Sequence, residues 1–507
     1  MILANLDLSE SDPKILKRAF EITGNGQEFT DTYGSIESGK KICLLNRDDW
    51  TIIVCEDDGG GTGGGGGSPF ITNECGCQIF ANQRKPGGTI KVEDTQFNQD
   101  FPVRRVRVVA KNGWFTWRRT DTDDNGCWRV DKEFSGRAWF WVKFKDTVTD
   151  RVKIRFSGIR GLRFWQKAFT GSVYLGRLNG PNFHNISTRF GRWNGQEVGT
   201  KVHYSWAGAT VNNALHEFHD FSSQEGFIPP PDNINMMVNL KRTGGFATML
   251  RQMGSQDFIT AVNQGVGFWA PNAIGFTLND NIGQVLVDAT QSLSWPQSSP
   301  LLNTFLGDVN TGGDFRNSDR MKRLAYHEIG HASHFAGSST SFYRSIIAAE
   351  VGAFGHGNPN VNLAGHIQIA ESWAQHMALT MVKLQYPPSV GNTSVVLSWE
   401  LEHEDVRNEK ENHIPIGIFN DLIDGINLSE NVYDEDDFIL DSNGFIVSVP
   451  RTPLRDNVTG GYTNQFFAQT MNSSVFTPDI LRQRCISSLP VNVTTADVND
   501  LFSEYNN

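Results

Sequence analysis

The segment Ala-Tyr-His-Glu-Ile-Gly-His-Ala-Ser-His-Phe at residues 325–335 constrains the fold more than any other part of this chain. Ser318 is a suitable N-cap for a helix through this segment, and Gly337 stands where a C-cap glycine would. One face of this helix, predicted over residues 318–337, carries Leu324, His327, Glu328, His331 and Phe335. Because buried polar groups need partners, this face must line a cleft or receive polar side chains from another element.

The order His-Glu-x-x-His within a predicted helix favours a zinc site over a buried helix with hydrogen-bonded histidines. His327 and His331 lie one helical turn apart, so their imidazoles can converge on a single Zn²⁺ ion. Glu328 then points beside the ion, where its carboxylate can accept a proton from a metal-bound water. We therefore predict His327 and His331 as metal ligands and Glu328 as a catalytic residue.

A catalytic zinc site needs a third protein ligand, and two glutamates are candidates. His334 is excluded, because it lies seven residues from His327, roughly 10 Å along a helix axis. Glu371 belongs to a long amphipathic pattern in which small residues would let two helices approach closely. Glu350 is surrounded by glycines and a proline that break helices. We predict Glu371 and keep Glu350 as the alternative, since a ligand must be held rigidly.

The first third of the chain has the alternation of β-strands. From about Gly88 to Phe156, six short stretches alternate apolar and polar residues, and Asn125-Gly126 marks a tight hairpin. This pattern predicts an antiparallel β-sandwich over residues 69–160, preceded by an N-terminal segment, 1–58, and a glycine-rich linker, 59–68. The turn at 121–126 resembles half of an EF-hand loop, but Lys132 replaces the glutamate that calcium requires.

The remaining residues, 161–507, predict an α+β domain whose C-terminal part is mostly helical, so the chain is multidomain. Helices are expected within 209–221, 417–423 and 464–470, in addition to the two helices of the zinc site. Short apolar stretches at 274–278 and 283–287 are expected to be strands.

Bulk composition excludes several classes of function. A net charge of −11 argues against a nucleic-acid-binding protein, which normally has a basic patch. No run of residues approaches the roughly 18–20 apolar residues that span a bilayer. The six cysteines match no zinc-binding spacing and are expected to be structural. Residues 1–14 lack the features of a signal peptide, which leaves a cytoplasmic protein or a secreted one whose signal is absent from this sequence.

Tyr-His-Glu-Ile-Gly-His-Ala-Ser-His-Phe-Ala-Gly, followed by Ala-Glu-Ser-Trp-Ala-Gln-His-Met, resembles zinc metallopeptidases of the gluzincin type over residues 321–382. The resemblance implies a zincin-like domain in which the two helix histidines and a downstream glutamate bind zinc. The spacing of Glu350 is that of the aminopeptidase branch, but the Phe-Gly-His-Gly-Asn-Pro loop departs from that branch, so aminopeptidase activity is not inherited. The strand-rich part resembles carboxypeptidase-regulatory or transthyretin-like modules of uncharacterised secreted bacterial proteins, which implies an extracytoplasmic location.

Peptide hydrolysis also requires a donor for the oxyanion of the tetrahedral intermediate. Tyr462 and His413 are candidates, because each lies near a glycine- or proline-marked turn, although a packed tyrosine and a surface histidine are the commoner outcomes. The substrate of a zincin usually lies along an edge strand, for which residues 283–287 are the candidate. His216, Glu217 and His219 form a shortened His-Glu-x-His, which we interpret as a polar helix face or the wall of a site.

Two functions follow from these patterns. The first is a zinc-dependent peptidase that acts on a peptide or protein substrate. The second is a catalytically silent zincin-fold adhesin that contacts a surface glycan or protein through the β-sandwich. Glu328 favours the first, because a silent zincin has no catalytic need of it.

Overall fold

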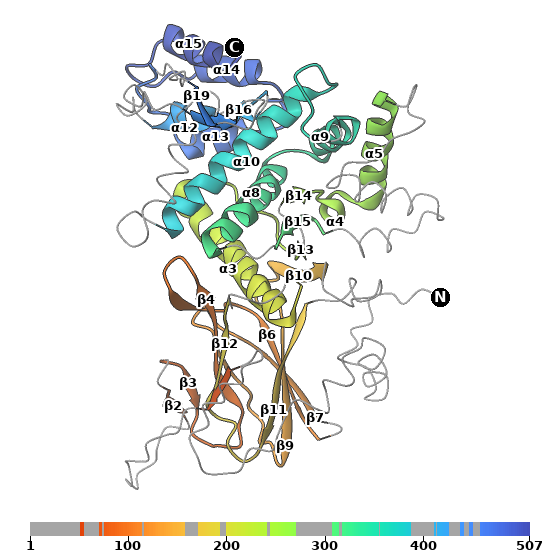
Figure 1. The fold of residues 1–507 in the computed structure, drawn as a ribbon, viewed down its shortest axis with the longest axis vertical. Helices are drawn as coiled ribbons and strands as arrows, with labels where there is room; N and C mark the ends of the chain where they lie inside the picture. Colours follow the sequence, from red (N-terminus) through yellow and green to blue (C-terminus); the bar gives the residue numbers. More distant parts are fainter. Residues whose placement is uncertain are drawn as a thin grey trace. The chain divides into compact units, whose positions relative to one another are not determined.

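The structure is a computed structural model, and its elements are labelled in Figure 1. It describes residues 51–54, 70–73, 76–113, 116–157, 171–192, 199–240, 244–269, 307–313, 317–353, 355–386, 410–411, 413–424, 437–440, 446–449 and 457–506. The glycine-rich linker and the strands expected at 274–278 and 283–287 lie outside these ranges. The chain has several sheets with antiparallel strands and many helices, so it is a mixed α/β protein of more than one unit.

Two compact units can be distinguished, and each is assembled from three separate segments of the chain. The first comprises residues 1–216, 232–245 and 303–322, and the second comprises residues 217–231, 246–302 and 323–507. Helix α3 (Lys201–Glu225) and helix α8 (Ser318–Gly337) both begin in the first unit and end in the second.

An antiparallel sheet of the first unit has the strand order β11-β9-β6-β7 (Figure 1). Its strands are β6 (Arg107–Asn112), β7 (Thr116–Asp121), β9 (Arg137–Lys143) and β11 (Ser172–Asn179). The alternation that predicted β9 is confirmed, because Phe140 and Val142 are buried while Trp139 and Trp141 are partly exposed. Strand β11 was not predicted.

A second sheet has the order β1-β12-β4-β5, with β8 also paired to β4, and it is mixed and not antiparallel as expected, because β12 runs parallel to β4. Its strands are β1 (Thr51–Val54), β4 (Gly87–Asp94), β5 (Gln99–Pro102), β8 (Cys127–Arg129) and β12 (Ile186–Phe190). Aromatic side chains of the two sheets meet in a shared core: the ring centroids of Trp128 and Phe140 are 5.9 Å apart. A separate short pair is formed by β2 (Phe70–Thr72) and β3 (Gln78–Phe80).

The predicted turn at Asn125-Gly126 forms, but it does not close a two-stranded hairpin. The carboxylate of Asp123 accepts hydrogen bonds from the backbone N–H groups of Asn125 and Cys127, at 2.9 Å each. The flanking strands then separate, because β7 pairs with β6 whereas β8 pairs with β4. A disulfide between Cys77 and Cys127, with Cα atoms 5.5 Å apart, fastens the end of this turn to the segment before β3.

A parallel sheet completes the first unit and corrects one prediction. Strand β10 (Val152–Ser157) was expected as the sixth strand of the antiparallel region, but it pairs in parallel with β13 (Ile234–Asn239). Strand β15 (Val309–Gly312) pairs with the other edge of β13. The buried guanidinium of Arg155 donates to the side chain of Asn235 at 2.8 Å, which helps to fix this register.

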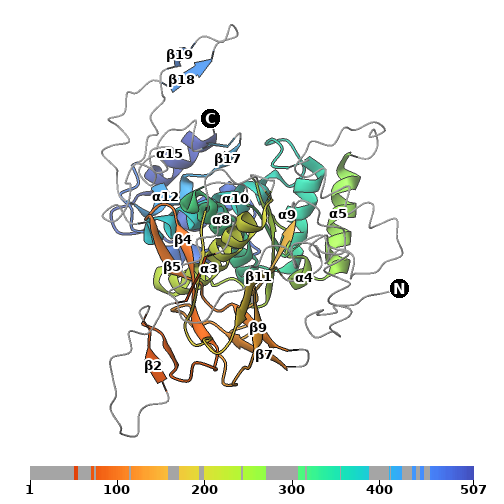
Figure 2. The ribbon, with the colours of Figure 1, turned by 60° about the horizontal axis from the view of Figure 1, so that its bottom comes forward.

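The second unit is mainly helical. Its other elements in the described residues are β14 (Phe246–Ala247), α4 (Leu250–Met253), α5 (Ser255–Trp269), α9 (Thr340–Ala353), α10 (Ala364–Gln385), β16 (Lys410–Glu411), β17 (Ile414–Pro415), α12 (Ile418–Ile423), β18 (Asp437–Leu440), β19 (Ile446–Val449), α13 (Asn464–Thr470), α14 (Pro478–Ile486) and α15 (Thr495–Asn506). Helices α5 and α9 lie side by side in Figure 2. None of the described helices is long and apolar enough to cross a bilayer.

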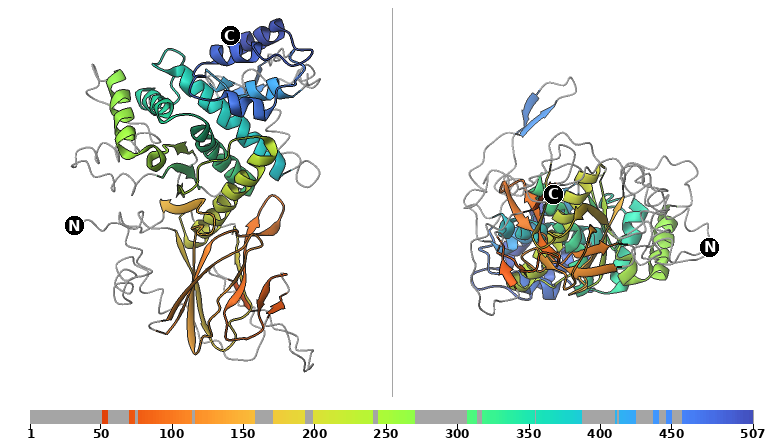
Figure 3. Two further views of the ribbon diagram at one scale, coloured as in Figure 1. Left: turned by 180° about the vertical axis from the view of Figure 1, so that it is seen from behind. Right: turned by 90° about the horizontal axis from the view of Figure 1, so that it is seen from below.

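Helices α8 and α10 approach each other closely at a glycine. A Cβ atom added to Gly330 of α8 would lie 3.2 Å from the Cα atom of Ala374 in α10, so little space separates the two backbones there. The two helices can be followed to this point of close approach in Figure 1 and in the left view of Figure 3. The expectation that small residues permit a close approach of these helices is confirmed, and the approach occurs between His327 and His331 on α8.

A buried histidine ties α10 to the C-terminal helices. His376 lies with its ring nitrogens 2.6 Å from the Oδ1 atom of Asn420 and 2.7 Å from that of Asn464. Its ring also stacks on Trp373, with centroids 5.5 Å apart and planes inclined by 19°. Because these contacts span α10, α12 and α13, they limit rotation of α10 and hence the position of Glu371.

Candidate metal centre

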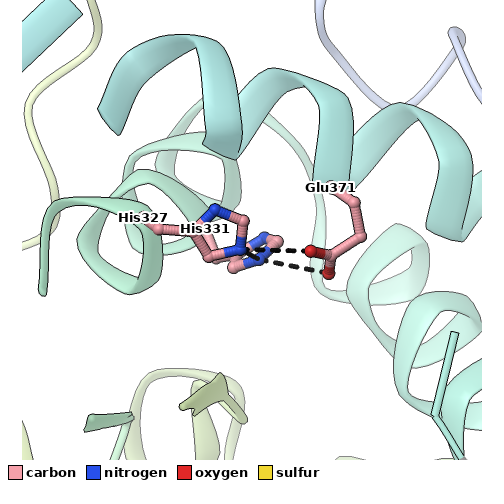
Figure 4. Close-up of side chains that lie close together, drawn as sticks. All are labelled: His327, His331 and Glu371. Carbon is pink, nitrogen blue, oxygen red and sulfur yellow. Dashed lines mark hydrogen bonds and ion pairs between the residues drawn. The ribbon is translucent and has the colours of Figure 1, made fainter. Parts of the chain in front are cut away.

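Helix α8 places its two motif histidines so that their rings face one point. The Nε2 atoms of His327 and His331 are 3.2 Å apart, and the rings are nearly perpendicular, at 87°. Helix α10 brings Glu371 to the same point: its Oε2 atom is 3.1 Å from His327 Nε2, and its Oε1 atom is 3.2 Å from His331 Nε2. Figure 4 shows the three side chains converging from the two helices. In the part of the chain that is described, this is the one group of three such side chains whose ligand atoms lie within 4.8 Å of one another.

These distances fit a tetrahedral zinc ion. Two ligand atoms that each lie about 2.0–2.1 Å from one ion at a tetrahedral angle are about 3.3–3.4 Å apart. The two imidazole nitrogens, 3.2 Å apart, are close to that value, and each lies 3.1 to 3.2 Å from one of the two oxygens of Glu371. The donor set of two imidazole nitrogens and one carboxylate is that of catalytic zinc sites, which leave a fourth position open. The residues present therefore suit a bound Zn²⁺ ion.

Contacts around α8 hold the histidines in place. The hydroxyl of Tyr343, from α9, donates a hydrogen bond to the backbone carbonyl of His331. The hydroxyl of Ser333 donates to the carbonyl of Ile228, in the segment after α3. Tyr326, which is fully buried, donates its hydroxyl to the carboxylate of Glu217 at 2.5 Å. These bonds fasten α8 to α9, to the segment after α3 and to α3 itself, and so fix the backbone that carries the two histidines.

Charge is distributed unevenly among the three ligands. Burial raises the pKa of Glu371, but the opposing effects of His331, His356 and hydrogen bonds from the histidines outweigh burial and hold that pKa well below its usual range. Burial lowers the pKa of His331, yet the charge and hydrogen bond of Glu371 outweigh it and raise the pKa to about 9. His327 has its pKa lowered, mainly by burial. The site without a metal therefore holds an ion pair between Glu371 and His331.

Glu328 is a buried carboxyl with a raised pKa and one oxygen that is unpartnered among the described residues, which are properties of a group that transfers protons. Its side chain is 3% exposed, and within the described residues its Oε2 atom has no hydrogen-bond partner. Burial raises its pKa to about 8, and this shift is opposed by the charge of His331. A buried carboxyl oxygen without a partner is costly in a folded protein. A ligand or water at the metal centre would supply the missing partner.

Glu350 lies near the centre but is not one of the three clustered residues. It belongs to α9, which continues to Ala353, so the expectation that nearby glycines would break the helix around Glu350 is wrong. Burial and the charge of Glu371 raise the pKa of Glu350 to about 7. The carboxyl of Glu350 is therefore close enough for the charge of Glu371 to change its pKa. The cluster of candidate ligand atoms in the described residues nevertheless contains only His327, His331 and Glu371.

One neighbour of the centre was missed by sequence reasoning. His356 lies in the loop between α9 and α10, and its Nε2 atom is 3.6 Å from Glu371 Oε2. Its side chain is 35% exposed, compared with 6% for Glu371, so it stands on the more open side of the site. Gly355 and Gly357 flank it with φ values of 119° and 69°, which favour glycine. The Gly-His-Gly sequence was the one available signal.

The remaining histidine candidates lie in other environments. His334 is 2% exposed between the rings of Phe342 and Tyr343, and burial lowers its pKa to about 3. His413 is buried rather than at the surface, and burial, followed by the charge of His356, lowers its pKa. Of the shortened His-Glu-x-His on α3, both histidines are buried.

Tyr462 is a packed tyrosine. Its hydroxyl donates to the backbone carbonyl of Cys485 at 2.8 Å, and its ring contacts Phe466 and Phe467. Because a tyrosine has one O–H donor, that donor is already used. We therefore give Tyr462 no role at the metal centre, in contrast to the expectation from its glycine-marked turn.

No protein-family profile matches the chain, and neither a curated protein nor a solved structure is detectably similar to it. The geometry of the site is therefore the basis for assigning a function.

Proposed function

We propose that this protein is a zinc-dependent peptidase that hydrolyses a peptide or protein substrate. The observation that carries the proposal is the convergence of His327, His331 and Glu371 from two helices, with the unpartnered carboxyl of Glu328 on the same face of α8. Zinc held by these residues would polarise a scissile carbonyl and lower the pKa of a coordinated water.

Glu328 acts as the general base. Burial raises its pKa to about 8, so its carboxyl has a high proton affinity when no metal is bound. The positive charge of a Zn²⁺ ion held by the neighbouring ligands would lower the pKa of Glu328 towards about 7. A pKa near the working pH is optimal for a group that both accepts and returns a proton. Glu328 accepts a proton from the attacking water and passes it to the leaving nitrogen.

His356 orients the site on its open side. At 3.6 Å from the Oε2 atom of Glu371, its imidazole is close enough to hold the ligand carboxylate through a small movement or a bridging water. We assign it a positioning role in the proposed reaction.

The finer architecture that goes with this proposal is an antiparallel β-sandwich followed by a zincin-like domain of the gluzincin type. Support comes from the order of the motif and the downstream glutamate along the chain, and from the aromatic core that the antiparallel sheet β11-β9-β6-β7 shares with the mixed sheet β1-β12-β4-β5. We also propose an extracytoplasmic location, which the Cys77–Cys127 disulfide supports because such bonds persist in oxidising compartments.

A comparison of Glu328→Gln with the unsubstituted protein tests the function. Both proteins should contain one zinc per chain, whereas Glu328→Gln should lose at least about a hundredfold in turnover of a peptide library, the low end of the effect of a general base. Glu133→Gln, an exposed substitution of the same kind in the other unit, is the matched control and should keep full activity. Stoichiometric zinc without cleavage of any peptide would instead favour a silent zincin-fold binding protein.

A further inference from the structure

The outer face of the sheet β11-β9-β6-β7 carries a group of aromatic side chains outside the core. The register places Trp141 of β9 beside Tyr174 of β11, and places Lys111 of β6 beside both Trp117 of β7 and Trp139 of β9. The four aromatic residues are all partly exposed, and the residues that alternate with those of β9 and β11 are buried in the core. Figure 1 shows β11, β9 and β7 together in the lower part of the first unit.

The rings form a continuous strip across the strands. The centroids of Trp117 and Trp141 are 5.7 Å apart with planes inclined by only 24°, and those of Trp141 and Tyr174 are 5.4 Å apart. The ammonium of Lys111 lies 4.8 Å from the ring of Trp117, and that of Lys201 lies 5.7 Å from the ring of Tyr174. These contacts hold the rings in fixed directions at little further cost in conformational entropy, as a preformed binding surface requires.

The same face is strongly basic. Among the described residues of these four strands, its basic members are Arg107, Lys111, Arg119, Arg137, Lys143 and Arg177. The face has a single acidic member, Asp121, which lies 3.3 Å from Arg107. The excess of five positive charges contrasts with a net charge of −11 for the whole chain. A basic face on an acidic protein attracts anions locally while the rest of the molecule repels them.

We propose that this face binds an anionic polysaccharide, one bearing carboxylate or sulfate groups. Flat rings present apolar surface on which the C–H faces of sugar rings pack, and the guanidinium and ammonium groups around them pair with the acidic substituents. A polymer with a repeating charge matches a strip that spans several strands, because adjacent sugars can contact adjacent rings. The site lies within the first unit, so the inference does not depend on the proposed peptidase activity.

Single-stranded nucleic acid is the competing ligand, since it also combines negative charge with flat groups that stack. The Cys77–Cys127 disulfide in the same unit favours a polysaccharide, because disulfides persist in oxidising compartments outside the cytoplasm. Polysaccharides are the abundant polyanions there, whereas most single-stranded nucleic acid is intracellular.

Affinity gel electrophoresis of the full chain tests the inference with four polymers: polygalacturonate for carboxylates, dextran sulfate for sulfates, neutral dextran, and oligothymidylate. The test variants are Arg119→Gln/Arg177→Gln, which removes two charges, and Tyr174→Leu, which removes one ring but no charge. Lys132→Gln is the matched control, because Lys132 is exposed after β8 and lies outside the four strands. Circular dichroism would verify that each variant is folded.

At least one of the charged polysaccharides should retard the full chain, and neutral dextran should not. The double arginine variant should bind about tenfold more weakly, and Tyr174→Leu should also lose affinity, while Lys132→Gln should match the original protein. Binding should weaken as salt rises, because exposed charges are screened. Absence of retardation by both charged polysaccharides, or unchanged retardation of the double variant, would overturn the proposal. Stronger retardation by oligothymidylate would reassign the face to nucleic acid.

Discussion

Replacement of Glu371 by alanine should remove most of the zinc affinity. The substitution deletes one of the three protein ligands without altering α8, which carries the other two. Structural zinc sites with four ligands bind with about 10–16 kcal/mol, or roughly 2.5–4 kcal/mol for each ligand. Each 1.4 kcal/mol is a factor of ten in affinity, so Glu371→Ala should bind zinc about 10²–10³ times more weakly.

Glu350→Ala is the matched control, because it removes the same side chain from α9 at a position close enough to sense the charge of Glu371. Loss of a neighbouring charge that does not bind the metal should change zinc affinity by no more than about tenfold. The assay is competition with a chromophoric chelator at fixed pH, supported by metal analysis of the purified proteins.

Two results would refute this reasoning. If Glu371→Ala bound zinc within a few-fold of the original protein, the carboxylate would not be a ligand. If Glu350→Ala lost more affinity than Glu371→Ala, the third ligand would be on α9, and the arrangement seen without metal would have to change when zinc binds.

One change of pH and two substitutions in α8 test the metal centre and the packing of the helix that carries it. Zinc affinity should rise about tenfold for each unit of pH between 6 and 8, because zinc must displace the proton that His331 holds with its pKa of about 9; chelator competition that was independent of pH would contradict this. His334→Leu should stabilise the fold by about 1–3 kcal/mol at pH 7, because both ring nitrogens are buried without a partner among the described residues. The gain should grow below pH 6.5, since unfolded chains then bind a proton that folded His334, with its pKa of about 3, does not; urea unfolding at pH 7 and 5 measures both effects. Gly330→Leu should lower the free energy of unfolding by about 1–3 kcal/mol and weaken zinc binding, because its side chain would meet Ala374; unchanged urea stability would show that the helices can separate freely.

Helix α8 could be predicted almost completely, because its signals are local. Its predicted range, 318–337, is the observed one, and the period of the pattern placed both histidines and Glu328 on one face. The choice between two glutamates could not be made on local grounds alone. Glu350 proved to be on a regular helix, so the helix-breaking residues near it did not distinguish the candidates; the distinction lies in how α10 packs at Gly330.

Strand partners were harder to predict than strands. The alternation in residues 138–145 predicted β9, and the pairing of β9 with β6 is consistent with an antiparallel arrangement. The same alternation in 151–156 could not show that β10 pairs with β13, which comes roughly 80 residues later, because partner choice is a long-range property. His356 was missed for a similar reason: only the fold brings that loop beside Glu371.

The interleaving of the two units has a consequence for how the chain can be handled and how it can have evolved. Because the polypeptide passes between the units within α3 and again within α8, neither unit is encoded by an uninterrupted stretch of the gene. A truncated product that starts or stops between α3 and α8 would separate strands that pair in one sheet. Strand β13, for example, pairs with β10, which precedes α3, and with β15, which directly precedes α8. Because the first turn of α8 belongs to the first unit, a fragment that carries the metal centre on a complete α8 also carries part of that unit.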